Sequence, residues 1–291
     1  MADNTTGILW ALLSAVMAAF TAVLAQRPLR HMGLMAATLW TNFMNTVVLA
    51  AWGWWIYEEG QFSLEGMLWF ALMGVTAYSY GRVVFYKALD TIGPPRLMTL
   101  MTTAPLLSLS LAVLFLGERP GLAVLGGTLL VIAGVTLVSY EPSEGRWVHR
   151  GILWGFASAL SLGVSVFLRK KGLAAMPNVG LTVAWSNLVS FPVLFSLRPL
   201  MPAALFEWRV GWAFWALLGV GFLNSFNQIL YNLAVLHGEV SVVGPIISSS
   251  PVFTLLFTAL LLRDTGRIRP ATAAGVLVTV GGMAAIALGR G

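Results

Sequence analysis

The chain has 291 residues, of which 58% are hydrophobic and only 10% are charged, and its mean hydropathy is +0.84. This composition leaves too little polar sequence to cover a water-soluble surface, so it excludes a soluble globular protein and indicates one that uses lipid as its solvent. The absence of cysteine excludes disulfides, and the net charge of +6 sits mostly in short loops, where Lys and Arg set membrane topology rather than bind nucleic acid.

The apolar runs have the length and pattern of membrane-spanning helices. A spanning helix needs about 20 apolar residues. The first run, residues 7–26, is apolar on every side, whereas strands of a membrane barrel alternate over about ten positions. No Lys or Arg precedes this run, which predicts a retained helix rather than a signal peptide. In chain order, we predict ten spans at residues 7–26, 34–56, 66–88, 96–116, 121–140, 151–169, 179–197, 211–236, 241–262 and 270–289.

The second half of the sequence repeats the first. The tetrapeptide GILW at residues 7–10 returns at 151–154, and WTN at 40–42 returns as WSN at 185–187. Further pairs follow in the same order, at an offset of about 144–148 residues: Tyr86 and Tyr231, Pro105 and Pro251, Glu118 and Asp264. One match could be chance, but an ordered series through both halves indicates a duplication.

We therefore predict an all-α integral membrane protein made of two five-helix repeats, residues 1–140 and 151–291, joined by a linker at 141–150. Because five is an odd number, the second repeat enters the membrane from the other side, and the two are inverted about an axis in the membrane plane. Such halves can exchange conformations around a central cavity that opens first to one side and then to the other. The predicted architecture is that of an alternating-access carrier.

The turn after the fourth helix of each predicted half contains an acidic residue, Glu118 or Asp264, and a Gly-rich fifth helix follows it. Together with the inverted ten-helix repeat, these features resemble the drug/metabolite transporter superfamily, specifically its EamA-type carriers, and most of all the YddG-type amino-acid exporters. The resemblance implies a multi-pass protein of the bacterial cytoplasmic (inner) membrane with both termini in the cytoplasm. It also implies a central cavity lined by the first, third, fourth, sixth, eighth and ninth helices.

The charges of the predicted loops favour the other orientation. Loops on the same side as the termini contain Arg119, Arg169, Lys170, Lys171 and Arg290. The loops on the other side contain Arg27, Arg30, Arg96, Arg146, Arg150, Arg198, Arg209, Arg263, Arg267 and Arg269. By the positive-inside rule, the termini would then lie outside. We expect the orientation that the resemblance implies, because a few arginines assigned to the wrong side of a short loop would change the tally.

Polar and aromatic side chains inside the spans concentrate in the third and eighth helices. Tyr78, Arg82 and Tyr86 recur at helical spacing and are expected to share one face. We predict Arg82 to be the only charged residue well inside a span, where a cation costs about 2.5–3.5 kcal/mol. It either receives a substrate carboxylate or closes a gate, or it makes a structural contact with a backbone carbonyl. Its repeat partner Asn227 is either a gate residue or a polar contact between helices.

The fourth and ninth helices carry Pro105 and Pro251 at matched positions of the repeat. A proline in mid-helix removes one hydrogen bond and bends the axis, so we predict both as hinges, with static kinks as the alternative. Hydroxyl side chains before each proline either bind substrate or satisfy the freed carbonyls. The complete set of candidate substrate-binding or gating residues is Tyr78, Arg82, Phe85, Tyr86, Met101, Thr102, Asn227, Tyr231, Ser248 and Ser249.

All eleven acidic residues fall in loops, tails or span ends. A proton-coupled extruder of cations needs a carboxylate inside the membrane, so we expect facilitated diffusion or exchange. One central cation beside aromatic and hydroxyl side chains predicts export or exchange of small neutral solutes, foremost amino acids with aromatic or large apolar side chains. The alternative substrates are nucleotide sugars, phosphorylated metabolites or drugs, although a phosphorylated anion calls for several buried Lys or Arg.

Other functional classes have less support. A channel more often forms its filter by oligomeric symmetry. An intramembrane hydrolase requires a nucleophile with its base, or a metal cluster, and the span cores contain neither a His nor paired Asp residues. We therefore expect no catalytic residues, no metal and no cofactor. The expected partners are the substrate and the lipid bilayer, with the chain a monomer or, as the open alternative, a dimer.

Overall fold

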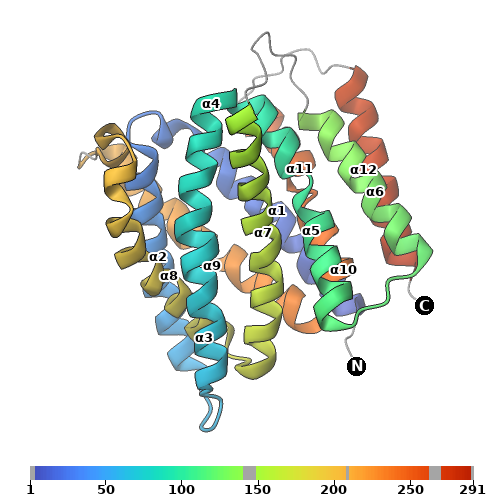
Figure 1. Cartoon of the computed structure of the whole chain (residues 1–291), viewed down its shortest axis with the longest axis horizontal. Coiled ribbons are helices and arrows are strands. Elements are labelled where there is room, and N and C mark those ends of the chain that lie inside the picture. Colours follow the sequence, from blue (N-terminus) through green and yellow to red (C-terminus); the bar gives the residue numbers. More distant parts are fainter. Residues whose placement is uncertain (1–3, 140–148, 208–209, 262–269, 290–291) are drawn as a thin grey trace.

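The structure, a computed structural model, describes residues 4–139, 149–207, 210–261 and 270–289. Within these ranges it consists of helices without a strand, as predicted (Figure 1). The first half contains α1 (Asn4–Leu29), α2 (Leu34–Trp55), α3 (Leu64–Met73), the π-helix η1 (Gly74–Tyr80), α4 (Gly81–Met101), α5 (Ala104–Leu111), the π-helix η2 (Ala112–Leu116) and α6 (Leu122–Ser139). The second half contains α7 (His149–Ala175), α8 (Val179–Ser196), the 3₁₀ turns η3 (Arg198–Leu200) and η4 (Ala203–Phe206), α9 (Trp212–His237), α10 (Val240–Ile247), α11 (Ser250–Leu261) and α12 (Pro270–Leu288). Residues 141–148 of the predicted linker and Asp264 lie outside the described ranges.

Nine helical segments of the described chain have the length and hydropathy of membrane spans, and they match nine of the predicted spans in order. The third predicted span, made of α3, η1 and the first part of α4, is not among them. It still runs the length of the bundle (Figure 1). With this span included, the described residues cross the bundle ten times.

Two predicted boundaries differ from the structure. α4 continues to Met101, but Gly93 within it has φ 77° and ψ 167°, a conformation open mainly to glycine, and the chain turns there from the third span into the fourth. α7 extends to Ala175, beyond the end predicted at 169, so Arg169 and Lys170 belong to the helix rather than to a loop. Because Arg and Lys are good helix formers, a basic run does not by itself end a helix.

The two halves are inverted. Figure 1 shows α1 beginning and α12 ending at one end of the bundle, which we call the terminal end. α6 ends and α7 begins at the other end, which we call the opposite end. Helices at equivalent positions of the two halves pack in equivalent pairs. α2 packs on its counterpart α8, and α6 packs on its counterpart α12. α1 packs on α9, and its counterpart α7 packs on α3 and α4. This pattern confirms the predicted pair of inverted repeats.

Glycines bring the fifth helices of the two halves into backbone contact. A methyl group built on Gly127 of α6 would lie 2.7 Å from the carbonyl oxygen of Gly282 of α12. The same construction on Gly134 meets the carbonyl oxygen of Gly275 at 2.6 Å. Small residues let membrane helices approach in this way. The neighbouring Gly126 has open space around its Cα, so the pattern of glycines alone does not say which of them are at the interface.

The fourth and ninth spans are broken, not bent. α4 ends at Met101 and α5 restarts at Ala104, so Pro105 lies in the first turn of a new helix, and Pro251 is in the same position in α11. Each proline thus follows a local interruption within its span, and its role as a hinge stays a prediction. A proline needs no hydrogen bond in a first turn, whereas within a helix it would clash with the carbonyl four residues before it. Both breaks stand at equivalent places in the two repeats.

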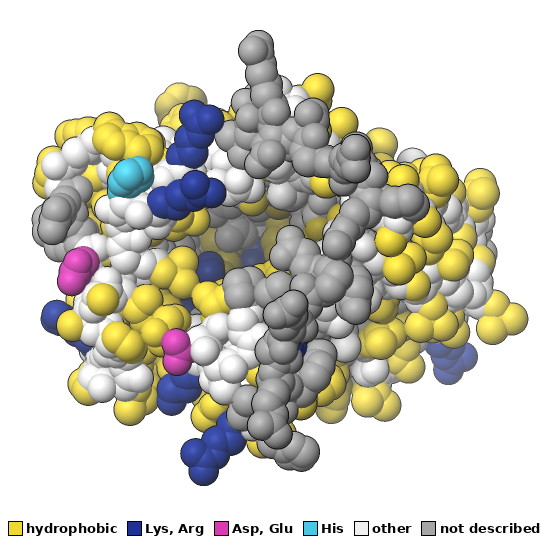
Figure 2. Space-filling view, turned by 90° about the horizontal axis from the view of Figure 1, so that it is seen from above, with side chains coloured by type: hydrophobic (Ala, Val, Ile, Leu, Met, Phe, Trp, Pro, Cys, Tyr) yellow, Lys and Arg dark blue, Asp and Glu magenta, His cyan; other side chains and the backbone are white. Residues whose placement is uncertain are grey.

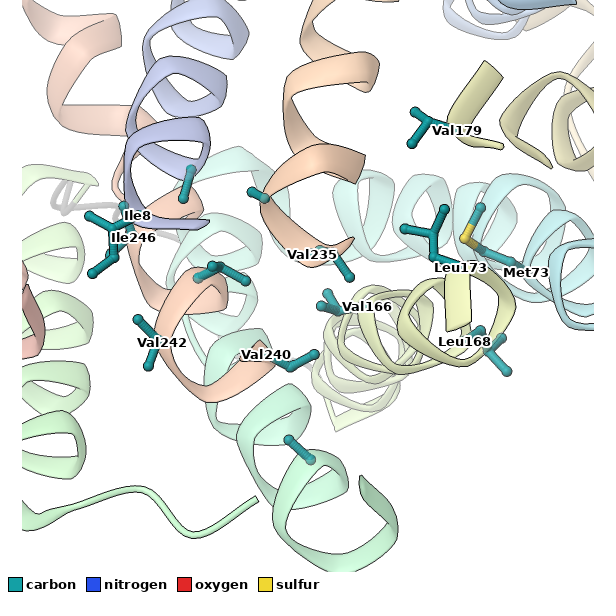
Figure 3. Close-up of a cluster of buried hydrophobic side chains, with 14 of the residues drawn as sticks. Ile8, Met73, Val166, Leu168, Leu173, Val179, Val235, Val240, Val242 and Ile246 are labelled. Carbon is teal, nitrogen blue, oxygen red and sulfur yellow. The ribbon is translucent and has the colours of Figure 1, made fainter. Parts of the chain in front are cut away.

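The largest cluster of buried apolar side chains joins α7, α9 and α10 near the terminal end (Figure 3). Val166 of α7, Val235 of α9 and Val240 of α10 lie next to one another in this view, and each is at most 6% exposed. Leu173 and Met73 extend the cluster toward α3. These side chains form an apolar seal across the bundle at its terminal end.

The glycine contact between α6 and α12 predicts opposite effects for neighbouring substitutions. Gly127→Ala should lower the free energy of unfolding by about 1–3 kcal/mol, because the methyl group overpacks against the Gly282 carbonyl. Gly126→Ala, one residue away in open space, should leave stability unchanged or raise it by up to about 1 kcal/mol through helix propensity. Thermal unfolding of the two detergent-solubilised variants checks this. Equal losses of stability in the two variants would mean that α6 and α12 do not meet at Gly127.

Candidate functional site

Two adjoining cavities lie inside the bundle. The central cavity, of about 290 Å³, is enclosed by η1, α4, α7 and α9, and the outer cavity, of about 350 Å³, by α1, α2, α4 and α9. Arg82 and Asn227 line both and so mark the passage between them. Figure 2, which views the opposite end, shows a hollow in the middle of this face with basic side chains inside it. The cavities are therefore reached from the opposite end.

The central cavity gathers most of the predicted third- and eighth-helix residues. Its lining is Ala77, Tyr78, Gly81, Arg82, Phe85, Met101, Ser158, Ser161, Leu162, Ser165, Arg169, Asn227, Gln228 and Tyr231. Tyr86 is not in it, because it packs with Met35, Val83 and Met201 on another face. At about 100° per residue, position 85 is about 20° from position 78 on a helix, whereas position 86 is about 80° away. Residues seven positions apart therefore share a helix face, and residues eight positions apart do not.

A second arginine, Arg169 of α7, is built into the wall of this cavity. It is 2% exposed, and its guanidinium donates to the hydroxyl of Tyr78 at 3.1 Å and to Oε1 of Gln228 at 3.5 Å. Gln228 also donates to the Tyr78 hydroxyl at 3.3 Å, and the Arg169 Cζ lies 4.3 Å from the centroid of the Tyr231 ring. The expectation that Arg82 is the only charged residue well inside a span is therefore wrong.

The π-helix η1 positions Tyr78 for this contact. The carbonyl of Thr76, which accepts a hydrogen bond from the backbone amide of Gly81 at the end of η1, also accepts one from Ser161 of α7 at 2.6 Å. Ser79 donates to the carbonyl of Gly74 within η1 at 3.0 Å and to that of Ser190 on α8 at 3.1 Å. Segments of this type recur at functional sites because they re-aim side chains within a continuous helix. Here η1 is tied to α7 on one side and to α8 on the other.

Arg82 differs from Arg169 in its surroundings. Its side chain is exposed to the cavities, and within the described chain it forms no hydrogen bond with a protein group. Asn227, across the passage, accepts a hydrogen bond from Ser14 of α1 at 2.9 Å, which ties α1 to α9. No Asp or Glu is among the described residues that line either cavity. The site is therefore cationic, with neutral hydrogen-bonding groups around it.

The residues at the two helix breaks line a third, smaller cavity of about 230 Å³, which includes Thr102, Pro105, Ser248 and Pro251. Met101 lines both this cavity and the central one. The hydroxyls of Thr102 and Ser248 donate to the carbonyls of Thr99 and Gly244 at 2.7 and 3.0 Å, so each satisfies a group near the break.

Ser249 does not reach any of these cavities. It is 0% exposed, and its hydroxyl donates to the carbonyl of Ile246 at 2.7 Å. Its role in the structure is local to the end of α10.

At the terminal end, two charged side chains cap the turn between α9 and α10. Lys170 of α7 donates to the carbonyls of Val235 and Gly238 at 2.7 and 2.8 Å, where α9 ends. Glu118 accepts from the backbone amides of Val240 and Ser241, both at 2.8 Å, where α10 begins. A cation at a helix C-terminus and a carboxylate at an N-terminus both complement the unpaired backbone groups there. Side chains from two other elements thus hold this turn.

Within the described ranges, the contact between α7 and α9 has no equivalent at the opposite end. In the repeat, α1 corresponds to α7, and the third span corresponds to α9. α7 packs against α9 near the terminal end, whereas among the described residues α1 and α4 make no comparable contact. The outer cavity lies between them, lined by Ala22 and Ala25 of α1 and by Arg82 of α4. The inverted halves are therefore in different conformations, closed at the terminal end and open at the opposite end.

Comparison with family models accounts for this architecture. The model of the EamA-like transporter family matches the chain in two segments, residues 5–140 and 149–288. The chain belongs to the EamA-like transporter family. It is thus a multi-pass membrane carrier for small solutes, of the drug/metabolite transporter superfamily.

Other comparisons agree with this membership of the EamA-like family. A crystal structure of a protein with 18% sequence identity superimposes on 98% of this chain and 96% of its own, with a TM-score of 0.79, which supports the fold. A curated relative is phosphoenolpyruvate/phosphate translocator 2, chloroplastic, of Arabidopsis thaliana, which is 28% identical over 136 residues. That match covers 44% of this chain and only 32% of the translocator, so the chain spans about a third of the relative's length.

The sequence pattern missed several residues of this EamA-like transporter's cavity. The basic run that Arg169 and Lys170 begin favours a loop, and Gln228 is not among the predicted binding or gating residues. A usable signal was present on α7: Ser158, Ser161, Ser165 and Arg169 are three or four residues apart, the spacing of one helix face. Extending the helix past Arg169 would have revealed this stripe.

The contacts of Arg169 predict that the Tyr78 hydroxyl matters for stability. Tyr78→Phe should lower the free energy of unfolding by about 1–3 kcal/mol, because Arg169 and Gln228 both lose a buried partner. Tyr80→Phe is the control, since Tyr80 is 48% exposed and should change stability by less than about 0.5 kcal/mol. Thermal unfolding in detergent measures both. A loss no larger in the first variant than in the control would mean that the buried contact contributes nothing.

Proposed function

We propose that this EamA-like transporter carries small carboxylate-bearing solutes by alternating access, and that it exports or exchanges amino acids as YddG-type carriers do. The observation that carries the proposal is the central cavity itself. It is a space of about 290 Å³ midway along helices that cross the membrane, lined by both polar and apolar side chains, and Arg82 is exposed in it without a hydrogen bond to any described protein group. A free guanidinium in such a place is suited to bind a carboxylate through two parallel hydrogen bonds.

The rest of the cavity suits the remaining parts of an amino acid. The amide groups of Asn227 and Gln228 offer oxygen acceptors for an ammonium group. The rings of Phe85 and Tyr231 offer apolar surface for a large or aromatic side chain. This arrangement supports neutral amino acids as the first candidates, transported without a membrane-embedded carboxylate for proton coupling.

A specific observation also favours a second candidate, the transport of anionic metabolites. A phosphorylated substrate calls for more than one buried cation. Arg169 provides a second cation beside Arg82. The similarity to a plant phosphoenolpyruvate/phosphate translocator supports the same class, although it covers less than half of the chain.

We assign the caps at the terminal end to the gate. Lys170 ties the turn between α9 and α10 to α7, and Glu118 ties it to the turn after η2. Both contacts lie directly beside the apolar seal of Val166, Val235 and Val240. Weakening either cap should make it easier for the terminal end to open. The helix breaks at Pro105 and Pro251 are the places where the fourth and ninth spans would pivot.

We further propose that the chain lies in the bacterial cytoplasmic membrane with both termini in the cytoplasm, as the resemblance to the YddG-type exporters implies. The open cavity would then face outward. The loop arginines count toward the other orientation, so labelling must decide between the two.

Flux measurements test the substrate. Proteoliposomes containing the protein should take up labelled phenylalanine or leucine, and Arg82→Ala should reduce that uptake by at least about tenfold through loss of a charge-assisted contact. Lys87→Ala is the matched control, because Lys87 is a cation on the same helix that lies over the Trp154 ring, outside the cavities. Uptake of a phosphate ester or a drug with none of any amino acid would rule the amino-acid assignment out.

The gate and the orientation can be read from one cysteine, because the chain contains none of its own. Ala22→Cys lies in the exposed wall of the outer cavity, so an impermeant maleimide should label it from outside intact cells. Adding Glu118→Gln should slow this labelling several-fold, since loss of the cap shifts the population toward opening at the terminal end. Glu59→Gln, an exposed carboxylate on the same end, should not. Labelling only in inverted vesicles would reverse the orientation, and equal rates in both variants would remove Glu118 from the gate.

A further inference from the structure

The central cavity contains two fixed cations and no described counter-ion. Arg82 and Arg169 both line it, and no Asp or Glu is among its described lining residues. An arginine is never deprotonated in a protein, so both carry their charge whatever the pH. A pair of like charges in a space of about 290 Å³ is unfavourable until an anion enters it.

Arg169 is held in place by neutral groups alone. Its terminal nitrogens donate to Tyr78 and Gln228, and the Tyr231 ring lies against the plane of its guanidinium. Its Nε is buried and has no hydrogen-bond partner among the described residues. These contacts fix the orientation of the guanidinium without neutralising it, which is how a preorganised anion site is built.

Hydroxyl groups continue the site along α7. Ser158, Ser161 and Ser165 line the cavity on the same helix face as Arg169. Ser161 and Ser165 use their protons on backbone carbonyls, while no hydrogen bond of Ser158 is formed within the described chain. An anion between the two arginines would thus meet at least one hydroxyl able to donate to it.

From this arrangement we propose that the substrate carries a net negative charge and binds with its anionic groups between Arg82 and Arg169. The inference rests on the carrier function proposed above, and of its two candidate substrate classes it selects the anionic metabolites over the neutral amino acids. The matching solutes are small dicarboxylates, acidic amino acids among them, and phosphate monoesters. A zwitterionic amino acid satisfies one arginine only, and it brings an ammonium group into a cavity that already holds two cations and no described carboxylate. Arg169 is then the residue that sets the selectivity for charge.

The test compares three labelled solutes in proteoliposomes: succinate, glycerol 3-phosphate and phenylalanine. Flux should be highest for at least one of the two anions, and that anion should compete with any phenylalanine flux. A preference for succinate would indicate dicarboxylate substrates, and a preference for glycerol 3-phosphate would indicate phosphate monoesters. Arg169→Gln should raise the half-saturation concentration of the anion by about 10–100-fold, the loss of one charge-assisted contact, while phenylalanine flux changes by less than about threefold. Lys171→Gln, which removes the charge two residues further along α7 and outside the cavity lining, should change neither.

Two further measurements keep the test decisive if Arg169→Gln folds poorly. Arg169→Lys keeps the charge but not the planar fork, so its half-saturation concentration should fall between those of the wild type and the glutamine variant. The transition temperature of the wild-type protein in detergent should rise with the transported anion and not with phenylalanine at the same concentration. Phenylalanine flux that neither anion shares or inhibits would overturn the charge selectivity and leave the carrier function intact. Absence of flux for all three solutes would instead overturn the carrier function.

Discussion

The structure depends on how a positive charge is kept inside a lipid-embedded bundle. A cation in the bilayer core must have partners or water, because the hydrocarbon offers neither. Arg169 has partners: a tyrosine hydroxyl, a glutamine oxygen and an aromatic face. Arg82 instead lies in the wall of the central cavity, where its side chain has open space. The contacts of Arg169 join three elements, α7, α9 and the π-helix η1, which carries Tyr78.

The same constraint explains what could be predicted from the sequence. Spans, their order and the inverted repeat follow from composition and from pairs such as Tyr86 and Tyr231, because a span must be apolar over a known length. Span length and order concern the lipid-facing surface, where every residue meets the same solvent, and the repeat shows as ordered residue pairs whichever way their side chains point. The all-α fold with ten crossings could therefore be predicted before any contact was known.

The interior was harder to predict because its residues meet one another. Arg169 was assigned to a loop by its basic neighbours, yet the structure surrounds it with groups that come from α3–α4 and α9. Tyr86 was placed one position off the cavity face, and Ser249 was placed in a cavity that it does not reach. Each error concerns a contact between segments far apart in sequence, which periodicity within one segment cannot reveal.

The space beside the two helix breaks has a mechanical consequence. A packed interior resists sliding because its side chains interlock with little free volume. Here a void of about 230 Å³ adjoins both breaks and the inner face of α6, and Pro105 and Pro251 border it. The short segments α5 and α11 border that void, and the glycine contact between α6 and α12 involves neither of them. The bundle thus combines a closely packed pair of helices, α6 and α12, with a loosely packed region around the two helix breaks.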